Sequence, residues 1–102
     1  MKRFKIVLSK KAEKDIENIY SYISDAFSEQ DAIIVITKIY KKIMLLDVFP
    51  ERTEPFEKDK NGQDLRATIS GRYRVIYVVE KSKSKVFIAR ILHVGQDLKG
   101  II

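Results

Sequence analysis

Residues Arg72–Leu98 read RYRVIYVVEKSKSKVFIARILHVGQDL, and this stretch decides the fold. Val, Ile, Tyr and Phe fill two runs, Tyr73–Val79 and Val86–His93, on either side of a polar break at Glu80–Lys85. β-Branched and aromatic residues favour strands, so the pattern predicts a β-hairpin. Both runs are nearly continuous in apolar character, which is typical of strands that are covered on both faces. Helices would supply one cover, and a partner or a substrate could supply the other.

Length and composition set the bounds of the fold. A chain of 102 residues with 45% apolar residues predicts a single domain, residues 1–102. No cysteine and only one histidine are present, so we expect no disulfide, no metal site and no cofactor. The apolar run near the N-terminus is too short for a signal peptide, and no run reaches membrane-spanning length. We therefore expect a cytoplasmic protein that does not engage a membrane.

The net charge of +6 is concentrated in the second half of the chain. Residues 1–51 hold 9 Lys/Arg and 8 Asp/Glu, which gives +1, whereas residues 52–102 hold 11 and 6, which gives +5. Basic domains commonly meet nucleic acid, acidic proteins or anionic surfaces. A lysine-rich surface that only aids solubility is the alternative interpretation.

Two helices are predicted between residues 10 and 49. In the first, from Lys10 to about Phe27, Ser9 is a suitable N-cap. Its apolar residues recur at helical spacing and form one stripe, which comprises Ala12, Ile16, Ile19, Tyr20, Ile23 and Phe27. The second helix begins after Ser28 and must stop before Pro50. Its apolar surface is so broad that we expect it to be buried more deeply than the first helix. The connection is very short, so the two helices should pair as an antiparallel hairpin.

The remaining segments complete an α+β fold with the element order β-α-α-β-β-β. Phe4–Leu8 reads as a first strand, and Asp64–Ser70 alternates apolar and polar residues as a half-buried strand does. Pro50–Gly62 is predicted to be a surface loop, with a short extended piece around residues 54–57. The last three strands should form an antiparallel meander sheet that packs against the N-terminal helical hairpin. The first strand joins this sheet at an edge or at its centre.

Four segments of the chain resemble the RelE/ParE superfamily of toxins, and more closely its ParE-like branch. They read VLSKKAEKDIENIYSYI, LLDVFPER, GRYRVIYVVE and VFIARILHVGQDL, and together they cover nearly the whole chain. The resemblance implies the same β-α-α-β-β-β fold. It also implies the toxin of a bacterial type II toxin–antitoxin system, active in growth inhibition and plasmid stabilization.

The resemblance further implies a cognate antitoxin whose acidic C-terminal segment binds the toxin, giving a toxin–antitoxin hetero-oligomer. The basic and apolar residues that we expect to contact such a partner are Arg72, Arg74, Ile76, Val78, Arg90, Ile101 and Ile102. The alternative for the apolar residues is that they close the core of the chain itself.

The superfamily divides by cellular target. ParE-like members are linked to DNA gyrase, which they inhibit by binding, whereas RelE-like members cut mRNA on the ribosome without a metal. If the chain is a metal-independent endoribonuclease, Arg66, Arg74 and His93 are the candidate catalytic residues. The lysine pair and the C-terminal tyrosine of the RelE type are absent, and Gln96 stands where many relatives have arginine. We therefore expect a non-enzymatic gyrase inhibitor, with the endoribonuclease as the alternative.

Overall fold

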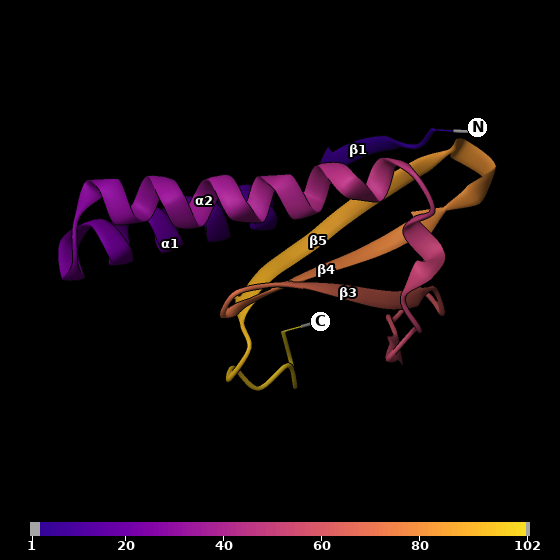
Figure 1. Cartoon of the computed structure of the whole chain (residues 1–102). Coiled ribbons are helices and arrows are strands. Elements are labelled where there is room, and N and C mark those ends of the chain that lie inside the picture. The colour runs from indigo at the N-terminus through magenta and orange to yellow at the C-terminus, as the bar shows by residue number, and fades with distance from the viewer. Residues whose placement is uncertain (1–2, 102) are drawn as a thin grey trace.

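The protein has two layers, a helical hairpin and a sheet, in a computed structural model that describes residues 3–101 (Figure 1). The helices are α1 (Lys10–Ala26) and α2 (Glu29–Met44). The strands are β1 (Lys5–Leu8), β2 (Glu57–Lys58), β3 (Asp64–Ser70), β4 (Tyr73–Glu80) and β5 (Lys85–His93). They form one sheet in the order β1-β5-β4-β3-β2, so the predicted α+β fold is confirmed.

The sheet is mixed rather than wholly antiparallel. Strands β3, β4 and β5 form the predicted antiparallel meander, and the short β2 extends it beyond β3. Strand β1 lies at the opposite edge and runs parallel to β5. The backbone N–H of Lys5 donates to the carbonyl of Ser84 at 2.8 Å, so the chain has returned to the starting end of β1 before β5 begins. Long connections of this kind are what parallel neighbours require.

Helix α2 ends earlier than predicted, at Met44 rather than just before Pro50. Two short 3-10 turns follow, and between them Phe49 adopts a left-handed conformation with φ of 52°. The Arg52 side chain donates to the carbonyls of Leu45, Val48 and Phe49 at 2.7, 2.8 and 3.2 Å. These bonds satisfy carbonyls that a continued helix would have paired, so the chain can turn toward the sheet.

The prediction that α2 is buried more deeply than α1 is wrong. Only Ala32, Ile39 and Ile43 of α2 are buried, whereas four residues of α1 are. The exposed fraction of Ile34, which lines the underside of α2, is 48%. Figure 1 shows the reason: the far half of the hairpin extends past the end of the sheet, where little of the sheet lies beneath α2.

Both faces of the sheet are covered, as the apolar strands predicted. The main core lies between the helices and the sheet and contains Ile16, Ile39, Val75, Tyr77 and Ile88. A smaller cluster lies on the other face and comprises Leu65, Ile76, Val78 and Leu92, with Leu98 and Ile101 of the C-terminal tail packed against it. The tail of the chain itself therefore provides the second cover. Neither α1 nor α2, the longest helices among residues 3–101, has the length and apolar character needed to cross a bilayer.

Candidate partner-binding groove

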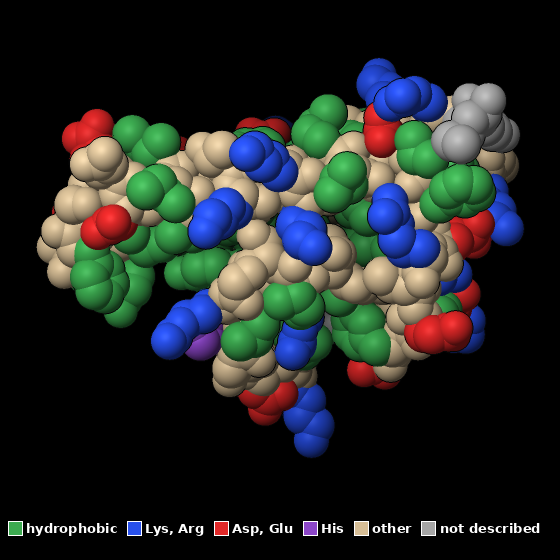
Figure 2. Space-filling view, viewed as in Figure 1, with side chains coloured by type: hydrophobic (Ala, Val, Ile, Leu, Met, Phe, Trp, Pro, Cys, Tyr) green, Lys and Arg blue, Asp and Glu red, His purple; other side chains and the backbone are tan. Residues whose placement is uncertain are grey.

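A groove of about 1040 Å³ opens beneath the overhanging end of the helical hairpin. Its upper wall is the underside of α1 and α2, and its lower wall is the β3–β4 turn with the end of β5. Figure 2 shows this hollow, with the imidazole and neighbouring basic side chains at its lower rim. The volume is slightly above the range of about 300–1,000 Å³ that is usual for small-ligand sites.

The upper wall is apolar and partly aromatic. It consists of Ile19, Tyr22, Ile23, Phe27, Ile34 and Val35. Tyr22 is 64% exposed and Phe27 is 71% exposed. Contiguous exposed apolar side chains of this size are typical of interaction surfaces.

An ion pair between α1 and β5 forms the inner end of the groove. Asp15 is only 9% exposed and accepts from Nε and Nη2 of Arg90 at 2.8 and 2.9 Å. The same carboxylate accepts from the backbone N–H of Ile91 at 2.9 Å. An irregularity in the β4–β5 register lets the Arg90 side chain reach α1. The hydrogen bonds to Asp15 raise the pKa of Arg90 above its ordinary value.

The lower rim carries a cation, an imidazole and an aromatic ring. Gly71, with φ of 58°, closes the β3–β4 turn and places exposed Arg72 at the groove. Tyr73 and His93 are paired across β4 and β5, and their rings meet edge to face with centroids 5.8 Å apart. The N–H of Gly95 donates to Nδ1 of His93 at 3.1 Å, which orients the imidazole. Partial burial raises the pKa of Tyr73 above its ordinary value.

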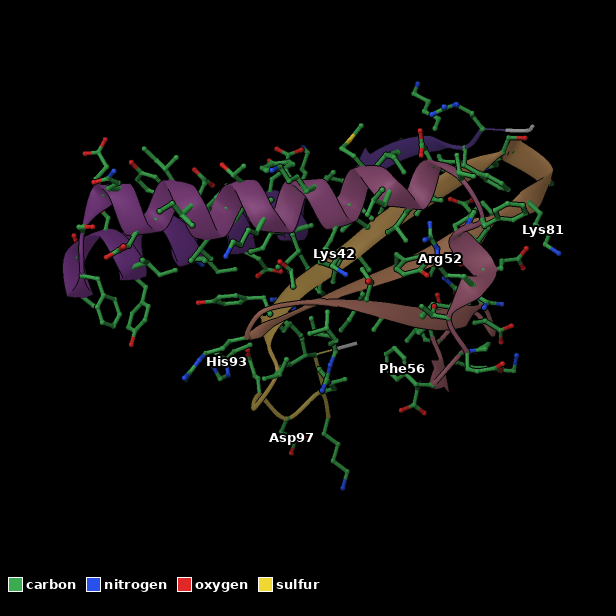
Figure 3. The ribbon with its side chains drawn as sticks, viewed as in Figure 1. Lys42, Arg52, Phe56, Lys81, His93 and Asp97 are labelled. Atoms are coloured by element: carbon green, nitrogen blue, oxygen red, sulfur yellow. The ribbon has the colours of Figure 1, made fainter. Side chains whose placement is uncertain are left out.

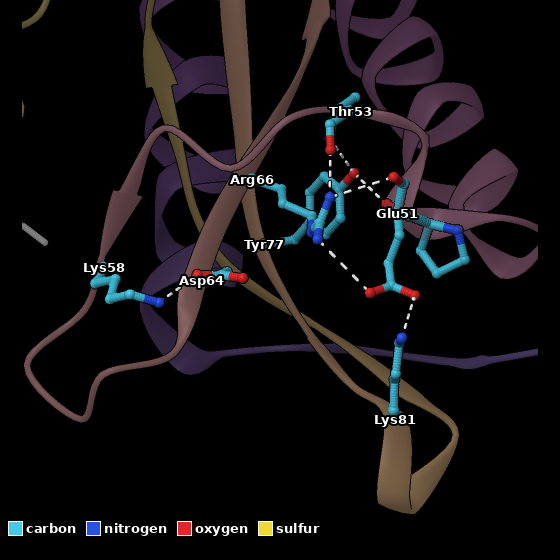
Figure 4. Close-up of polar contacts among 8 residues, drawn as sticks. Glu51, Thr53, Lys58, Asp64, Arg66, Tyr77 and Lys81 are labelled. Atoms are coloured by element: carbon cyan, nitrogen blue, oxygen red, sulfur yellow. Dashed lines mark hydrogen bonds and ion pairs between the residues drawn. The ribbon is translucent and has the colours of Figure 1, made fainter.

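Arg66, a candidate catalytic residue, is held in a structural cluster at the other end of the sheet (Figure 4). Its guanidinium donates to the carbonyls of Glu51 and Thr53 and lies 3.6 Å from the Glu51 carboxylate. Glu51 also pairs with Lys81 at 3.2 Å. Beside it, the Tyr77 hydroxyl donates to the carbonyl of Pro50 at 2.6 Å. Arg66 therefore fastens the turn at residues 50–53 to β3.

The three candidate catalytic residues do not form one site. Arg66 is opposite Tyr77 in the sheet, whereas His93 is opposite Tyr73, four residues away along β4. That offset alone separates the two side chains by about 13 Å. Lys81 marks the position of the Arg66 cluster, because it pairs with Glu51. Figure 3 shows His93 and Lys81 at opposite ends of the sheet. Arg74 lies on the other face, where it donates to the carbonyl of Val94 at 3.3 Å.

The residues predicted to contact a partner are also divided between the two faces. Arg72 and Arg90 line the groove, although Arg90 is already engaged by Asp15. Ile76 and Val78 are 0% and 5% exposed on the other face, where Ile101 packs against their cluster. Arg74 lies on the same face as Ile76 and Val78, as the alternation of these three residues along the strand predicted. Ile102 lies outside the described residues. Within residues 3–101, no group of three or more His, Asp or Glu side chains could hold a metal ion.

Sequence reasoning missed the aromatic wall of the groove. It placed Phe27 on the apolar stripe of the first helix, and Tyr22 was not among the residues of that stripe. The signal was the run Ile33–Ile36, which carries more apolar residues than one buried helical stripe can use. Such an excess indicates a second apolar contact surface.

Comparisons with known proteins agree on the fold and the family. The family model described as ParE toxin of type II toxin-antitoxin system, parDE, matches residues 6–98. No curated protein matches the chain.

Solved structures share the fold at low sequence identity. A chain of the chromosomal ParDE toxin–antitoxin system from Pseudomonas aeruginosa is 16% identical, with a TM-score of 0.75 over 90% of this chain and 97% of that one. A chain of the toxin–antitoxin complex RelBE2 from Mycobacterium tuberculosis is also 16% identical, with a TM-score of 0.65 over 89% and 98%. For the RelE–RelB complex from Pyrococcus horikoshii, the identity is 16% and the TM-score is 0.63 over 93% and 99%. With the family model spanning nearly the whole chain, this protein belongs to the ParE toxin family of type II toxin–antitoxin systems, within the RelE/ParE superfamily.

Proposed function

We propose that this toxin inhibits DNA gyrase by binding it, without catalysing a reaction, and that an antitoxin segment in the groove neutralises it. The observation that carries the first part is the separation of Arg66, Arg74 and His93. Cleavage through the ribose 2′-OH needs a base, a cation and an acid around one phosphate. Here one cation is committed to the chain's own carbonyls and another lies on the opposite face of the sheet. Since gyrase acts in the cytoplasm, the proposal also places the toxin there.

The groove is suited to an amphipathic helix with acidic side chains on its flank. The apolar residues of the helix would pack against Tyr22, Phe27 and Ile34, which otherwise expose apolar surface to water. Lys38 and Arg72 line the same groove, and neither has an ion-pair partner among residues 3–101. Carboxylates of the partner would supply these missing counter-charges. Relatives of similar fold were solved as toxin–antitoxin complexes, which supports an antitoxin as the occupant.

A ribosome-dependent mRNA endoribonuclease is the second candidate function. The observation that favours it is the lower rim of the groove, where His93 is exposed beside Arg72 and Tyr73. An imidazole can exchange a proton near neutral pH, and an arginine can bind a phosphate. In that mechanism His93 would be the acid or base, and Arg72 would replace the distant Arg66 as the phosphate-binding cation.

The two functions are separated by assaying purified toxin, freed from antitoxin, against gyrase and against translating ribosomes. For gyrase binding, we expect inhibition of supercoiling with accumulation of cleaved DNA as toxin concentration rises. The His93→Ala variant should retain most of this inhibition, because the imidazole is not needed for chemistry. If supercoiling is unaffected while mRNA on ribosomes is cut and His93→Ala abolishes the cut, the gyrase proposal is refuted.

Antitoxin docking is tested with two neighbouring isoleucines of equal size and similar exposure. Ile34 lines the groove, whereas Ile33 does not. We expect Ile34→Asp to weaken binding of the cognate antitoxin at least tenfold in isothermal titration calorimetry, while Ile33→Asp changes it less than threefold. Equal losses in the two variants would contradict docking in the groove. Circular dichroism of both variants checks that the fold is intact.

A further inference from the structure

A row of four exposed cations runs from the β3–β4 turn to the end of α2, and we call it the basic row. Arg72 and Lys38 line the same groove, and Lys42 lies one helical turn beyond Lys38 on the same side of α2. Arg52 joins the row from the following segment, because its guanidinium donates to the carbonyl of Leu45 at 2.7 Å. Figure 2 shows basic side chains over and below α2 with no acidic side chain between them, and Figure 3 labels Lys42 and Arg52.

Two segments that contain no acid pack against each other beneath the basic row. Residues 32–46, in α2 and its end, and residues 65–79, in β3 and β4, together hold three lysines and three arginines but no Asp or Glu. On α1, by contrast, Lys10 and Lys14 alternate with Glu13 and Glu17. The fold therefore gathers like charges along one strip of the surface, and their mutual repulsion opposes folding.

The acids that border the basic row do not neutralise it. Asp47 and Glu51 are each paired with cations outside the row. Asp31 precedes the row by about two helical turns on α2, and Glu54 follows it in the next loop. Within residues 3–101, none of the four cations has an ion-pair partner. Even if both free acids are counted against the row, two positive charges remain.

The dipole of α2 explains only part of this charge. Cations are stabilising in the last turn of a helix, where Lys41 and Lys42 lie. The Arg52 side chain already donates to three carbonyls at this end of the helix. Lys38 lies before the last turn and Arg72 lies on the β3–β4 turn, so the dipole does not account for them. An anionic ligand that extends along the row accounts for all four cations.

We propose that the basic row binds the phosphate backbone of duplex DNA. From Lys38 to Leu45 the row is about 10 Å long, which matches about three phosphates of one DNA strand, and Arg72 extends it across the groove. The one aromatic residue of α2, Tyr40, lies on the opposite side of the helix, so this side offers phosphate contacts and no surface for base stacking. The choice of DNA rests on the proposed function, because gyrase holds duplex DNA. An antitoxin in the groove would cover Lys38 and Arg72 and so compete with the DNA.

The number of cations sets the salt dependence of DNA binding. When four phosphates are neutralised, the logarithm of the binding constant falls against the logarithm of the salt concentration with a slope of about −3.6. Raising the salt concentration from 50 to 200 mM should therefore weaken binding about 150-fold. Contacts to phosphates carry no sequence information, so duplexes of different sequence should bind equally well.

Fluorescence anisotropy with a labelled duplex of about 20 base pairs, a length that exceeds the basic row, tests the proposal. It uses the full chain, freed from antitoxin, without gyrase. The Lys38→Gln/Lys42→Gln variant removes two charges of the row. It should bind at least tenfold more weakly at 100 mM salt, with a slope of about −1.8. The matched control is Lys10→Gln/Lys14→Gln, which removes two exposed charges at the same spacing from α1 and should change the affinity less than threefold. Circular dichroism checks the fold of both variants.

Three results would overturn the proposal. The first is that the wild-type toxin does not bind the duplex at 50 mM salt. The second is an equal loss in the two double variants, which would mean that only net charge matters. The third is displacement of the duplex by polyglutamate of the same total charge as effectively as by unlabelled DNA, which would assign the basic row to an acidic protein.

A supercoiling assay separates this proposal from gyrase inhibition itself. Lys42 does not line the groove, so Lys42→Glu leaves the proposed antitoxin site intact. This variant should need at least fivefold more toxin for half-maximal inhibition of gyrase, whereas the control Lys14→Glu should need the same amount as the wild type. A toxin that binds DNA but does not inhibit gyrase refutes only the gyrase proposal. A toxin that inhibits gyrase, with or without Lys42→Glu, and does not bind DNA refutes only the DNA contact.

Discussion

Replacing Asp15 with asparagine should destabilise the fold by about 3 kcal/mol, which is a large fraction of the stability of a domain this small. The carboxylate is buried and accepts three hydrogen bonds, two of them from Arg90. An asparagine retains one oxygen but turns an amide N–H₂ toward the guanidinium, so a charge-assisted hydrogen bond worth about 1.5–3 kcal/mol is lost. Removing one partner of a buried pair costs about 3–5 kcal/mol, because the other charge stays buried without a counter-charge.

We expect the lower end of that range, because the Arg90 side chain is still 21% exposed and water in the groove can hydrate it in part. The assay is urea unfolding at pH 7, followed by circular dichroism, for Asp15→Asn, Arg90→Met and the double variant. The two single losses should not add, and the double variant should be more stable than Asp15→Asn alone, since it leaves no unpaired charge.

A matched control for the first prediction is Asp64→Asn. Asp64 accepts from Lys58 at 2.7 Å, and this contact lowers the pKa of its carboxyl, but the pair is exposed to solvent. Its loss should change the free energy of unfolding far less than the loss of Asp15 does. The reasoning is refuted if Asp15→Asn and Asp64→Asn have similar effects, or if the losses at Asp15 and Arg90 simply add.

Three further predictions concern groups outside the groove. Burial raises the pKa of Tyr77. The stability that the protonated hydroxyl contributes is therefore complete below about pH 10 and is lost as pH rises through the folded-state pKa. In urea unfolding between pH 8 and 11, the Tyr77→Phe variant should show a smaller alkaline loss of stability than the wild type. Ending the chain after Val94 removes Leu98 and Ile101 from the second face of the sheet. This should cost about 2–4 kcal/mol in the same assay, whereas a change under 1 kcal/mol would contradict the packing of the tail. Arg66→Gln should lower the free energy of unfolding by about 1–3 kcal/mol, because hydrogen bonds to the turn are lost. The folded variant should still be toxic, which is measured as growth arrest at reduced temperature. Loss of toxicity without loss of stability would restore Arg66 as a catalytic candidate.

Local sequence patterns predicted most of the elements correctly. The first helix, the strand Asp64–Ser70 and both strands of the opening stretch lie within a residue or so of their predicted bounds. Each has a hydrophobic period or a capping residue that acts over a few positions. Ser9, for example, caps α1 as predicted, accepting from the N–H of Ala12 at 2.9 Å. The end of α2 was predicted wrongly, because Pro50 excludes helical structure only close to itself. Hydrogen bonds from the Arg52 side chain stabilise a helix end five residues before the predicted one.

The sequence by itself determined the fold class, the family resemblance and which segments are apolar enough to be covered. It did not determine what covers each surface, because burial depends on partners distant in the chain. The tertiary structure put the tail over Ile76 and Val78, separated Arg74 from His93 by the thickness of the sheet, and paired Arg90 with Asp15. It also carried the hairpin beyond the sheet, which left the groove beneath α1 and α2 open. Hydrophobic periodicity predicts which side chains are buried away from water. It does not predict whether other residues of the same chain or a second molecule covers them, because that depends on the tertiary structure.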